Sequence, residues 1–256
     1  MGQTICFANN KGGVGKTTTS VAIGQAWARM NKKVLFIDLD SQANLTRMVS
    51  PIEPKDRKYT VADALLAKGP LQLERINENI DLLPAGLALS NFDKATASVT
   101  GREYLLVDAL APVKDRYDFI IIDCPPALGL ITYNAMIASD HLVMVATPDY
   151  LAYEGMLMVG QVYEDVSTSA RLNQNLSFTG VIVTKYKNNN LSKMFSDQVE
   201  NELGPIVLKP FIGEATKITQ AGSFRQSIYD YDPKGKVTLQ YIEVAKALAL
   251  RILTEK

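Results

Sequence analysis

A glycine-rich segment close to the start of the chain carries residue types that bind phosphate. It covers residues 9–18 and reads NNKGGVGKTT, with an apolar run before it and a helix-compatible run after it. Glycines let the backbone bend sharply and approach an anion without Cβ clashes, and N–H groups of the loop and the helix start can then point at phosphate oxygens. Lys16 can reach the outer phosphates, and the Thr17 hydroxyl can bind Mg²⁺. The segment therefore predicts a phosphate site, formed by Lys11, Gly12, Gly13, Val14, Gly15, Lys16, Thr17 and Thr18.

Aspartates follow two further apolar runs. Residues 33–37 precede the segment DLDSQ, and residues 119–122 precede Asp123. Continuous apolar runs suit parallel strands that are buried on both faces, and a carboxylate at such a strand end is costly unless a cation or water lies beside it. We expect Asp123 to hold the Mg²⁺ shell opposite Thr17. Capping of a helix near Gln42 is a competing structural role for Asp38 and a weaker one for Asp40.

The elements that would position these residues alternate between strand-like and helix-like runs. Strands are predicted at 5–8, 33–37, 79–83, 119–122, 141–146 and 178–184, and helices at 16–30, 61–68, 87–98, 104–114, 150–166 and 236–253. Residues 43–60 are predicted to form a loop. The alternation favours an α/β fold, in which helices cover both faces of a mostly parallel twisted sheet. With no internal repeat and no linker-like run, we expect one domain over residues 1–256.

The composition restricts the partners and the compartment. The chain has 27 Lys and Arg against 27 Asp and Glu, so any DNA binding must come from a local patch or from dimerisation. The two cysteines, Cys6 and Cys124, make no disulfide framework and are expected to be small buried thiols, while His141 is expected to be packed in the fold. No stretch reaches the ~18 apolar residues of a membrane span, and no signal peptide is recognisable. We therefore expect a cytoplasmic protein without a membrane partner.

The phosphate-binding segment departs from the common pattern G-x-x-x-x-G-K-[ST]. Asn10 stands where that pattern has its first glycine, and Lys11 follows it. A lysine at this place is badly positioned to fold onto the γ-phosphate of its own chain, but it could reach the phosphates of a second subunit docked face to face. The segment resembles the deviant Walker A motif of the ParA/MinD group of P-loop ATPases. The resemblance to the small ParA partition proteins covers nearly the whole chain and is most specific at residues 10–18, 37–42 and 118–126.

This resemblance implies an ATPase with weak intrinsic activity that uses ATP and Mg²⁺. Mg-ATP would join two subunits into a sandwich dimer that binds double-stranded DNA without sequence specificity, and hydrolysis, stimulated by a ParB-type centromere-binding protein, would release the DNA. The cycle would segregate plasmids or chromosomes and place the ATP-bound protein on the nucleoid. Because the loop begins almost at residue 1, we expect no separate N-terminal DNA-reading domain. The resemblance also implies catalytic roles for Lys11, Lys16 and Asp40, and magnesium contacts from Thr17, Asp40 and Asp123.

Two parts of the resemblance are less close. Where members of the family often have an asparagine that reads adenine, this chain has Thr184 and Lys185, which we assign to the ATP site. Lys217 falls where many members carry a basic residue implicated in DNA contact, although Glu214 departs from the usual arginine. The residues assigned to DNA are Lys185, Lys187, Lys193, Lys217 and Arg225. An ordinary solvated lysine face is an equal alternative for each of them.

Three other functions compete with DNA partition. A MinD-like membrane-cycling ATPase would need a basic amphipathic helix after the last domain helix, and the sequence stops at Lys256, three residues after Leu253. An iron–sulfur reductase would need exposed cysteine ligands at a shared interface, for which Cys124 is the one candidate. A ParA-like ATPase that positions a protein cargo would have the same sequence features, because the partner sets the cargo.

Overall fold

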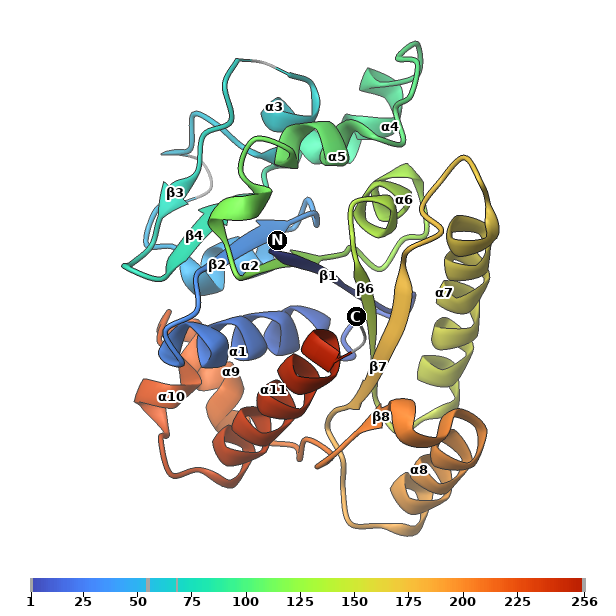
Figure 1. Ribbon diagram of the computed structural model, residues 1–256. Helices are drawn as coiled ribbons and strands as arrows, with labels where there is room; N and C mark the ends of the chain where they lie inside the picture. Colours follow the sequence, from blue (N-terminus) through green and yellow to red (C-terminus); the bar gives the residue numbers. More distant parts are fainter. Residues whose placement is uncertain (1, 54–55, 68, 255–256) are drawn as a thin grey trace.

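One sheet runs through the computed structural model, which describes residues 2–53, 56–67 and 69–254 (Figure 1). Within these ranges the strands lie in the order β3-β4-β2-β5-β1-β6-β7-β8. Their bounds are β1 Gln3–Ala8, β2 Val34–Asp38, β3 Glu74–Arg75, β4 Ile80–Leu83, β5 Phe119–Asp123, β6 His141–Ala146, β7 Ser177–Val183 and β8 Val207–Leu208. Neighbouring strands are parallel except for β3, which pairs antiparallel with β4. The mostly parallel sheet that the sequence predicts is confirmed.

Helices cover both faces of this sheet, also as predicted. The helices are α1 Lys16–Arg29, α2 Asn44–Val49, α3 Val61–Leu65, α4 Phe92–Ala95, α5 Leu105–Leu110, α6 Leu130–Ile137, α7 Tyr150–Thr168, α8 Asn190–Leu203, α9 Thr216–Ser223, α10 Ile228–Tyr231 and α11 Lys236–Thr254, with 3-10 turns η2 Leu87–Asn91, η3 Lys114–Arg116 and η4 Gly204–Ile206. Helix α1 contacts β1, β2 and β5 and packs along α11, whereas α7 contacts β6 and packs beside α6. Figure 1 shows these two helix pairs on opposite sides of the sheet.

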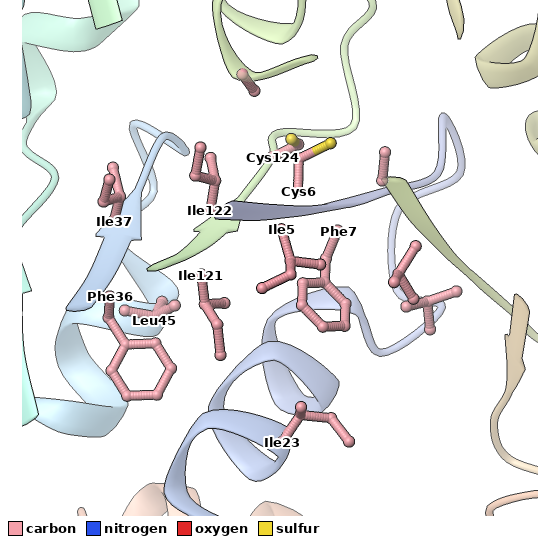
Figure 2. Packing of buried hydrophobic residues seen from close by; sticks show 14 of the residues in the cluster. Ile5, Cys6, Phe7, Ile23, Phe36, Ile37, Leu45, Ile121, Ile122 and Cys124 are labelled. Atoms are coloured by element: carbon pink, nitrogen blue, oxygen red, sulfur yellow. The ribbon is translucent and has the colours of Figure 1, made fainter. Parts of the chain in front are cut away.

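The central strands bury side chains on both faces. In Figure 2, Ile5 and Phe7 of β1 point toward α1 and its Ile23, while Cys6 points to the other face beside Cys124. All five residues are buried, as the period of two along a strand requires when both faces are covered. The expectation of two small buried thiols is therefore confirmed.

Trp27 ties three elements of the core together. Its ring stacks on Phe119 of β5 with centroids 4.0 Å apart, and its Nε1 donates to the Ala245 carbonyl oxygen of α11 at 2.8 Å. A buried tryptophan needs a partner for its N–H, and the α11 carbonyl supplies one. Helix α1, which follows the phosphate-binding segment, is thus fixed from both the sheet side and the α11 side.

His141 is packed in the fold, as expected. Its Nδ1 lies 2.7 Å from the Thr179 hydroxyl, and its Nε2 lies 3.1 Å from Gln3 Oε1. The side chain is buried at the start of β6. Both ring nitrogens therefore serve contacts between neighbouring strands.

The prediction of a loop over residues 43–60 is wrong, because α2 occupies Asn44–Val49. The polar sequence gives no clear helix signal here, and the first turn of the helix is held by a residue from outside its own segment. Buried Asp38 accepts hydrogen bonds from both the backbone N–H and the hydroxyl of Thr46, at 2.9 and 2.8 Å. Helices predicted at 87–98 and 104–114 are also shorter than expected and break into 3-10 turns. The helix predicted at 61–68 ends at Leu65, and residue 68 lies outside the described residues.

None of the helices within the described ranges combines the length and the apolar character that crossing a bilayer requires.

Candidate functional site

The phosphate-binding segment forms a loop between β1 and α1. Gly13 and Gly15 have φ angles of 77° and 90°, a region that side-chain-bearing residues rarely adopt. A Cβ atom placed on Gly12 or Gly13 would meet no atom within 4 Å, so the loop backbone borders open space. Gly15 occupies the N-cap of α1 without any side-chain cap, which leaves the N–H groups of the first helical turn available to an anion.

Asn9 anchors the start of this loop, a role that was not predicted from the sequence. Its Nδ2 donates to the carbonyl oxygens of Val145 and Ala152 at 2.8 and 3.2 Å, and its Oδ1 accepts from the Lys11 N–H at 2.8 Å. The side chain is buried. The available signal was a polar residue placed directly after a buried strand, where it must find partners inside the protein.

Thr184 and Lys185 hold the other side of the same loop. The Thr184 hydroxyl donates to the Val14 carbonyl oxygen at 2.6 Å, and Lys185 Nζ donates to the Gly13 carbonyl oxygen at 2.7 Å. Lys185 has a φ of 51°, in the left-handed region. Both residues therefore lie beside the predicted site and contact the loop backbone, while the Thr184 N–H also donates to the Ala146 carbonyl oxygen of β6 at 2.8 Å.

Lys16 is buried inside the site. Its Nζ donates to the Lys11 carbonyl oxygen at 3.3 Å, and its exposed fraction is 7%. Burial lowers the pKa of the Lys16 ammonium, and the nearby charges of Asp123 and Asp40 oppose that shift. An ammonium group that has lost most of its water and has one carbonyl partner gains from an added anion.

The two strand-end aspartates lie opposite each other on β2 and β5. Asp38 pairs in register with Asp123, and both side chains are fully buried. Asp123 accepts from the Thr17 hydroxyl at 2.7 Å and from the Ser20 hydroxyl at 3.1 Å. Burial, and next the charge of Asp38, raise the pKa of Asp123 to about 7. Burial likewise raises the pKa of Asp38 to about 6.

These oxygen atoms fit a magnesium ion. Mg²⁺ prefers carboxylate and hydroxyl oxygens, and the contact between Thr17 and Asp123 brings one of each together. Burial raises the pKa of Asp123 although the Lys16 charge acts to lower it, so a bound cation would stabilise the charged form of this carboxylate. Thr17 and Asp123 are thus placed to hold the ion, and Asp40, which the sequence also assigns to it, lines the same groove.

Asp40 borders the site with one carboxylate oxygen unused. Its Oδ1 accepts from the Gln42 N–H at 2.9 Å, and its own N–H donates to Asp38 Oδ1 at 3.1 Å. Within the described part of the chain, its Oδ2 has no hydrogen bond. Both aspartates thus accept backbone hydrogen bonds in this turn, and Asp40 in addition keeps one acceptor oxygen free within the described residues.

These residues line a groove of about 1040 Å³. The groove is also lined by α9 and by the residues just before it. Its wall is made by the phosphate loop, the ends of β2, β5 and β7, and residues 212–223. The groove is of the size of small-molecule sites. Lys217, which the sequence assigns to DNA contact, lies in this segment and also lines the groove beside the loop.

Lys11 contacts an acidic residue of its own chain. Its Nζ lies 2.6 Å from Asp149 Oδ1, and the two side chains are 31% and 35% exposed. Asp149 also caps α7 by accepting from the Ala152 N–H at 3.0 Å. Burial acts to raise the pKa of Asp149, but hydrogen bonds from Lys11 and Thr147 outweigh it and leave that pKa lowered. Lys11, which the sequence predicts to contact the phosphates bound to a partner subunit, is therefore partly exposed at the edge of the loop and is paired with Asp149 of its own chain.

The residues assigned to DNA contact are not all free cations. Lys187 pairs with Glu214 and Lys217 with Asp232, and the structure brings these two pairs to one cavity. Arg225 pairs with Glu53 after α9. Lys193 lies exposed on α8 and has no ion pair within the described ranges.

The buried thiols do not suit a shared metal cluster. Cys6 is 0% and Cys124 is 1% exposed, and Cys6 Sγ lies 3.6 Å from the His141 carbonyl oxygen. Neither sulfur reaches a surface that a second subunit could share. The iron–sulfur alternative thus loses the cysteine on which it depends.

Comparison with known proteins gives matches over nearly the whole chain. A family model described as an AAA domain matches residues 2–178. The sporulation initiation inhibitor protein Soj of Bacillus subtilis is 36% identical over 254 residues, which cover 97% of this chain and 99% of that protein. The chromosome partitioning protein ParA of Caulobacter vibrioides is 31% identical over 255 residues, which cover 97% of this chain and 94% of that protein.

Solved structures share the fold. The structure of cobyrinic acid a,c-diamide synthase from Mycobacterium smegmatis with bound ADP and magnesium has a TM-score of 0.86 and 30% identity, and the match covers 100% of this chain and 97% of that one. The structure of apo McdA from Cyanthece also has a TM-score of 0.86, with 23% identity, and covers 97% of this chain and 100% of that one.

Proposed function

Because this chain belongs to the ParA family of partition ATPases, we propose that it hydrolyses ATP in a cycle of dimerisation and DNA binding that segregates plasmids or chromosomes. The nucleotide is ATP and the metal is Mg²⁺, in keeping with the ADP, ATP analogue and magnesium bound in related structures. The observation that carries the proposal is the phosphate loop itself, with buried Lys16 and the Thr17–Asp123 contact on its inner side.

The residues of this chain bind and orient the triphosphate. Loop N–H groups and the start of α1 receive the phosphates, and Lys16 supplies a buried positive charge beside them. Thr17, Asp40 and Asp123 would hold Mg²⁺, and the ion when bound would supply positive charge that offsets the negative charge of the phosphates. The open Oδ2 of Asp40 is available to accept a hydrogen bond from the attacking water and so to orient it.

Dimerisation would be driven by the negative charge of the γ-phosphate, which attracts a further cation from a second subunit. Lys11 lies at the edge of the loop, and the side chain is already half-exposed. A second subunit docked on this face would bring its own Lys11 to the phosphates across the interface. This cross-subunit contact makes the dimer depend on ATP.

DNA binding follows from the dimer. Two copies of the basic residues on one assembly double the number of phosphates that can be neutralised, and affinity for duplex DNA grows steeply with that number. Hydrolysis dissolves the dimer and releases the DNA. A ParB-type protein would stimulate this step and connect the cycle to its cargo.

Removal of Lys11 tests the proposal. In a titration of a nonspecific duplex across a salt series, we expect the wild type to bind with ATP and to bind weakly with ADP or no nucleotide. Lys11→Ala is expected to lose the ATP-dependent binding, because its dimer lacks the cross-subunit cation. The control is Lys246→Ala, which removes an exposed lysine of α11.

The outcomes separate the parts of the proposal. Wild-type binding of Lys11→Ala would contradict the cross-subunit role of this lysine. No DNA binding by the wild type in any nucleotide state would leave the ATPase in place and contradict the DNA partner, and lipid vesicles would then be tested.

Freeing Lys11 from its own chain is expected to favour dimerisation. Asp149→Asn removes the charge that pairs with Lys11 but keeps a side-chain oxygen that can cap α7. An exposed ion pair contributes about 0.2–1 kcal/mol, and the dimer opens one such pair in each subunit, so its dissociation constant with ATP should fall by about 2- to 30-fold. Sedimentation with a non-hydrolysable ATP analogue measures this constant.

The matched control for that experiment is Asp197→Asn, which neutralises an exposed aspartate of α8. An unchanged or weaker dimer in Asp149→Asn, with an unchanged melting temperature, would mean that the Lys11–Asp149 pair does not restrain the dimer.

A further inference from the structure

Part of the basic surface assigned to DNA is neutralised by carboxylates of the same chain. Lys187 Nζ lies 2.9 Å from Glu214 Oε2, and Lys217 Nζ lies 2.9 Å from Asp232 Oδ1. Each pair joins a basic residue to an acid from a different turn of the chain. The net charge that these four residues offer to a polyanion is zero.

Both pairs line one cavity of about 510 Å³, together with Lys236. Glu214 and Lys217 also line the groove that contains the phosphate loop. The two ion pairs therefore stand between the nucleotide groove and the outer surface. The charges of these four residues would therefore attract or repel a nucleic-acid phosphate backbone that lies across the cavity.

The backbone around each pair is fixed, so the contacts follow from the fold. Tyr186 bridges to Gly213, and its N–H donates to the Ile212 carbonyl oxygen at 3.0 Å. This bridge places Lys187 next to Glu214.

The second acid is held in the turn between α10 and α11. The Asp232 carbonyl oxygen accepts from the Gly235 N–H at 3.0 Å and from the Thr238 hydroxyl at 2.7 Å. The Asp232 side chain is 22% exposed, so the acid is the more enclosed partner of Lys217.

An incoming phosphate must compete with these carboxylates for the lysines. The side chains of Lys187 and Glu214 are 58% and 52% exposed, and that of Lys217 is 56% exposed. Exposed ion pairs are weak and are screened by salt, so a polyanion can open them, but the displaced carboxylate stays close and repels it. We infer that Glu214 and Asp232 are counter-anions that hold Lys187 and Lys217 and thereby set the affinity of this surface for the DNA backbone. The inference rests on the proposed DNA-binding function.

Neutral variants of the two acids test the inference. Glu214→Gln and Asp232→Asn each remove one negative charge and preserve the size of the side chain. With ATP saturating for each variant, we expect tighter binding of a nonspecific duplex and a salt dependence steeper by about 0.9 per freed lysine. At about 0.15 M salt this change in slope corresponds to roughly 5-fold tighter binding per freed contact. Glu243→Gln is the matched control, because it removes an exposed acid of α11 away from the cavity.

A second set of variants distinguishes the release of a lysine from a general change in charge. The gain in DNA affinity from Glu214→Gln should disappear when Lys187→Gln is already present, because no lysine is then left for the substitution to release. The gain should persist in a Lys193→Gln background, since Lys193 has no carboxylate partner within the described residues.

The possible results separate this inference from the function on which it rests. If the wild type binds DNA with ATP and both neutral variants bind equally well, the counter-anion role is wrong and the proposed function stands. A gain that survives in the Lys187→Gln background also contradicts the role. If neither the wild type nor the neutral variants bind DNA, the proposed partner and the inference both fail.

Discussion

A Lys16→Ala variant loses ATP binding by about 100-fold or more in dissociation constant. Lys16 is the buried cation of the phosphate loop, and hydrogen bonds to charged groups contribute roughly 1.5–3 kcal/mol each. Contacts with both outer phosphates therefore account for about 3 kcal/mol or more, or roughly two factors of ten in affinity. Calorimetric titration with ATP and Mg²⁺ measures the loss.

The variant should remain folded. Burial lowers the pKa of Lys16, which means that its charge is unfavourable in the ligand-free fold. Lys16→Met keeps the volume of the side chain and removes the charge, and it should show the same loss. The control is Lys246→Ala on the exposed face of α11. Wild-type ATP affinity in both Lys16 variants would contradict the assignment of the phosphate loop.

Asp40→Ala is expected to separate ATP binding from ATP hydrolysis. The carboxylate borders the groove, and its Oδ2 has no partner within the described part of the chain. A positioned acid–base group contributes about 10²–10⁴-fold to a rate, so the turnover number should fall at least about 100-fold. ATP-dependent dimerisation should persist, because Lys11 and Lys16 are unchanged. Single-turnover release of phosphate measures the chemical step.

Two comparisons make the Asp40 experiment specific. Asp40→Asn can keep the contact with the Gln42 N–H but cannot act as a base, so it should be as slow as Asp40→Ala. Asp115→Ala removes an aspartate that does not line the groove and should turn over normally. Normal hydrolysis in both Asp40 variants would exclude this residue from the reaction.

The phosphate loop and the sheet could be predicted because their signals are local. A glycine-rich run between a strand and a helix, and apolar runs that end in Asp38 and Asp123, need no knowledge of distant residues. The register between β2 and β5 then brings those two carboxylates together. Parallel strands buried on both faces leave few other arrangements.

The contacts that the sequence did not reveal join residues far apart in the chain. Lys11 and Asp149 are separated by 138 positions, and Asn9 and Val145 by 136. Such pairs depend on which strands are neighbours in the sheet. Helix α2 was missed for a related reason, since a carboxylate outside its own segment holds its first turn.

The basic residues show the same limit. A lysine in the sequence carries a charge, but whether this charge is open to a partner depends on the acids that the fold places beside it. Glu214 is three positions from Lys217 and yet pairs with Lys187, across two separate turns. Only the tertiary structure distinguishes the paired lysines from Lys193.

The single tryptophan of the chain makes the protein its own optical probe. Trp27 lies between Phe119 and α11, out of contact with water, with an exposed fraction of 1%. Its fluorescence emission therefore reports from one place in the core, and unfolding will move that emission to longer wavelength as the indole meets water. The indole also lies at the far end of α1 from the phosphate loop, so this signal can follow the integrity of every variant without a label and without interference from an added nucleotide at the loop.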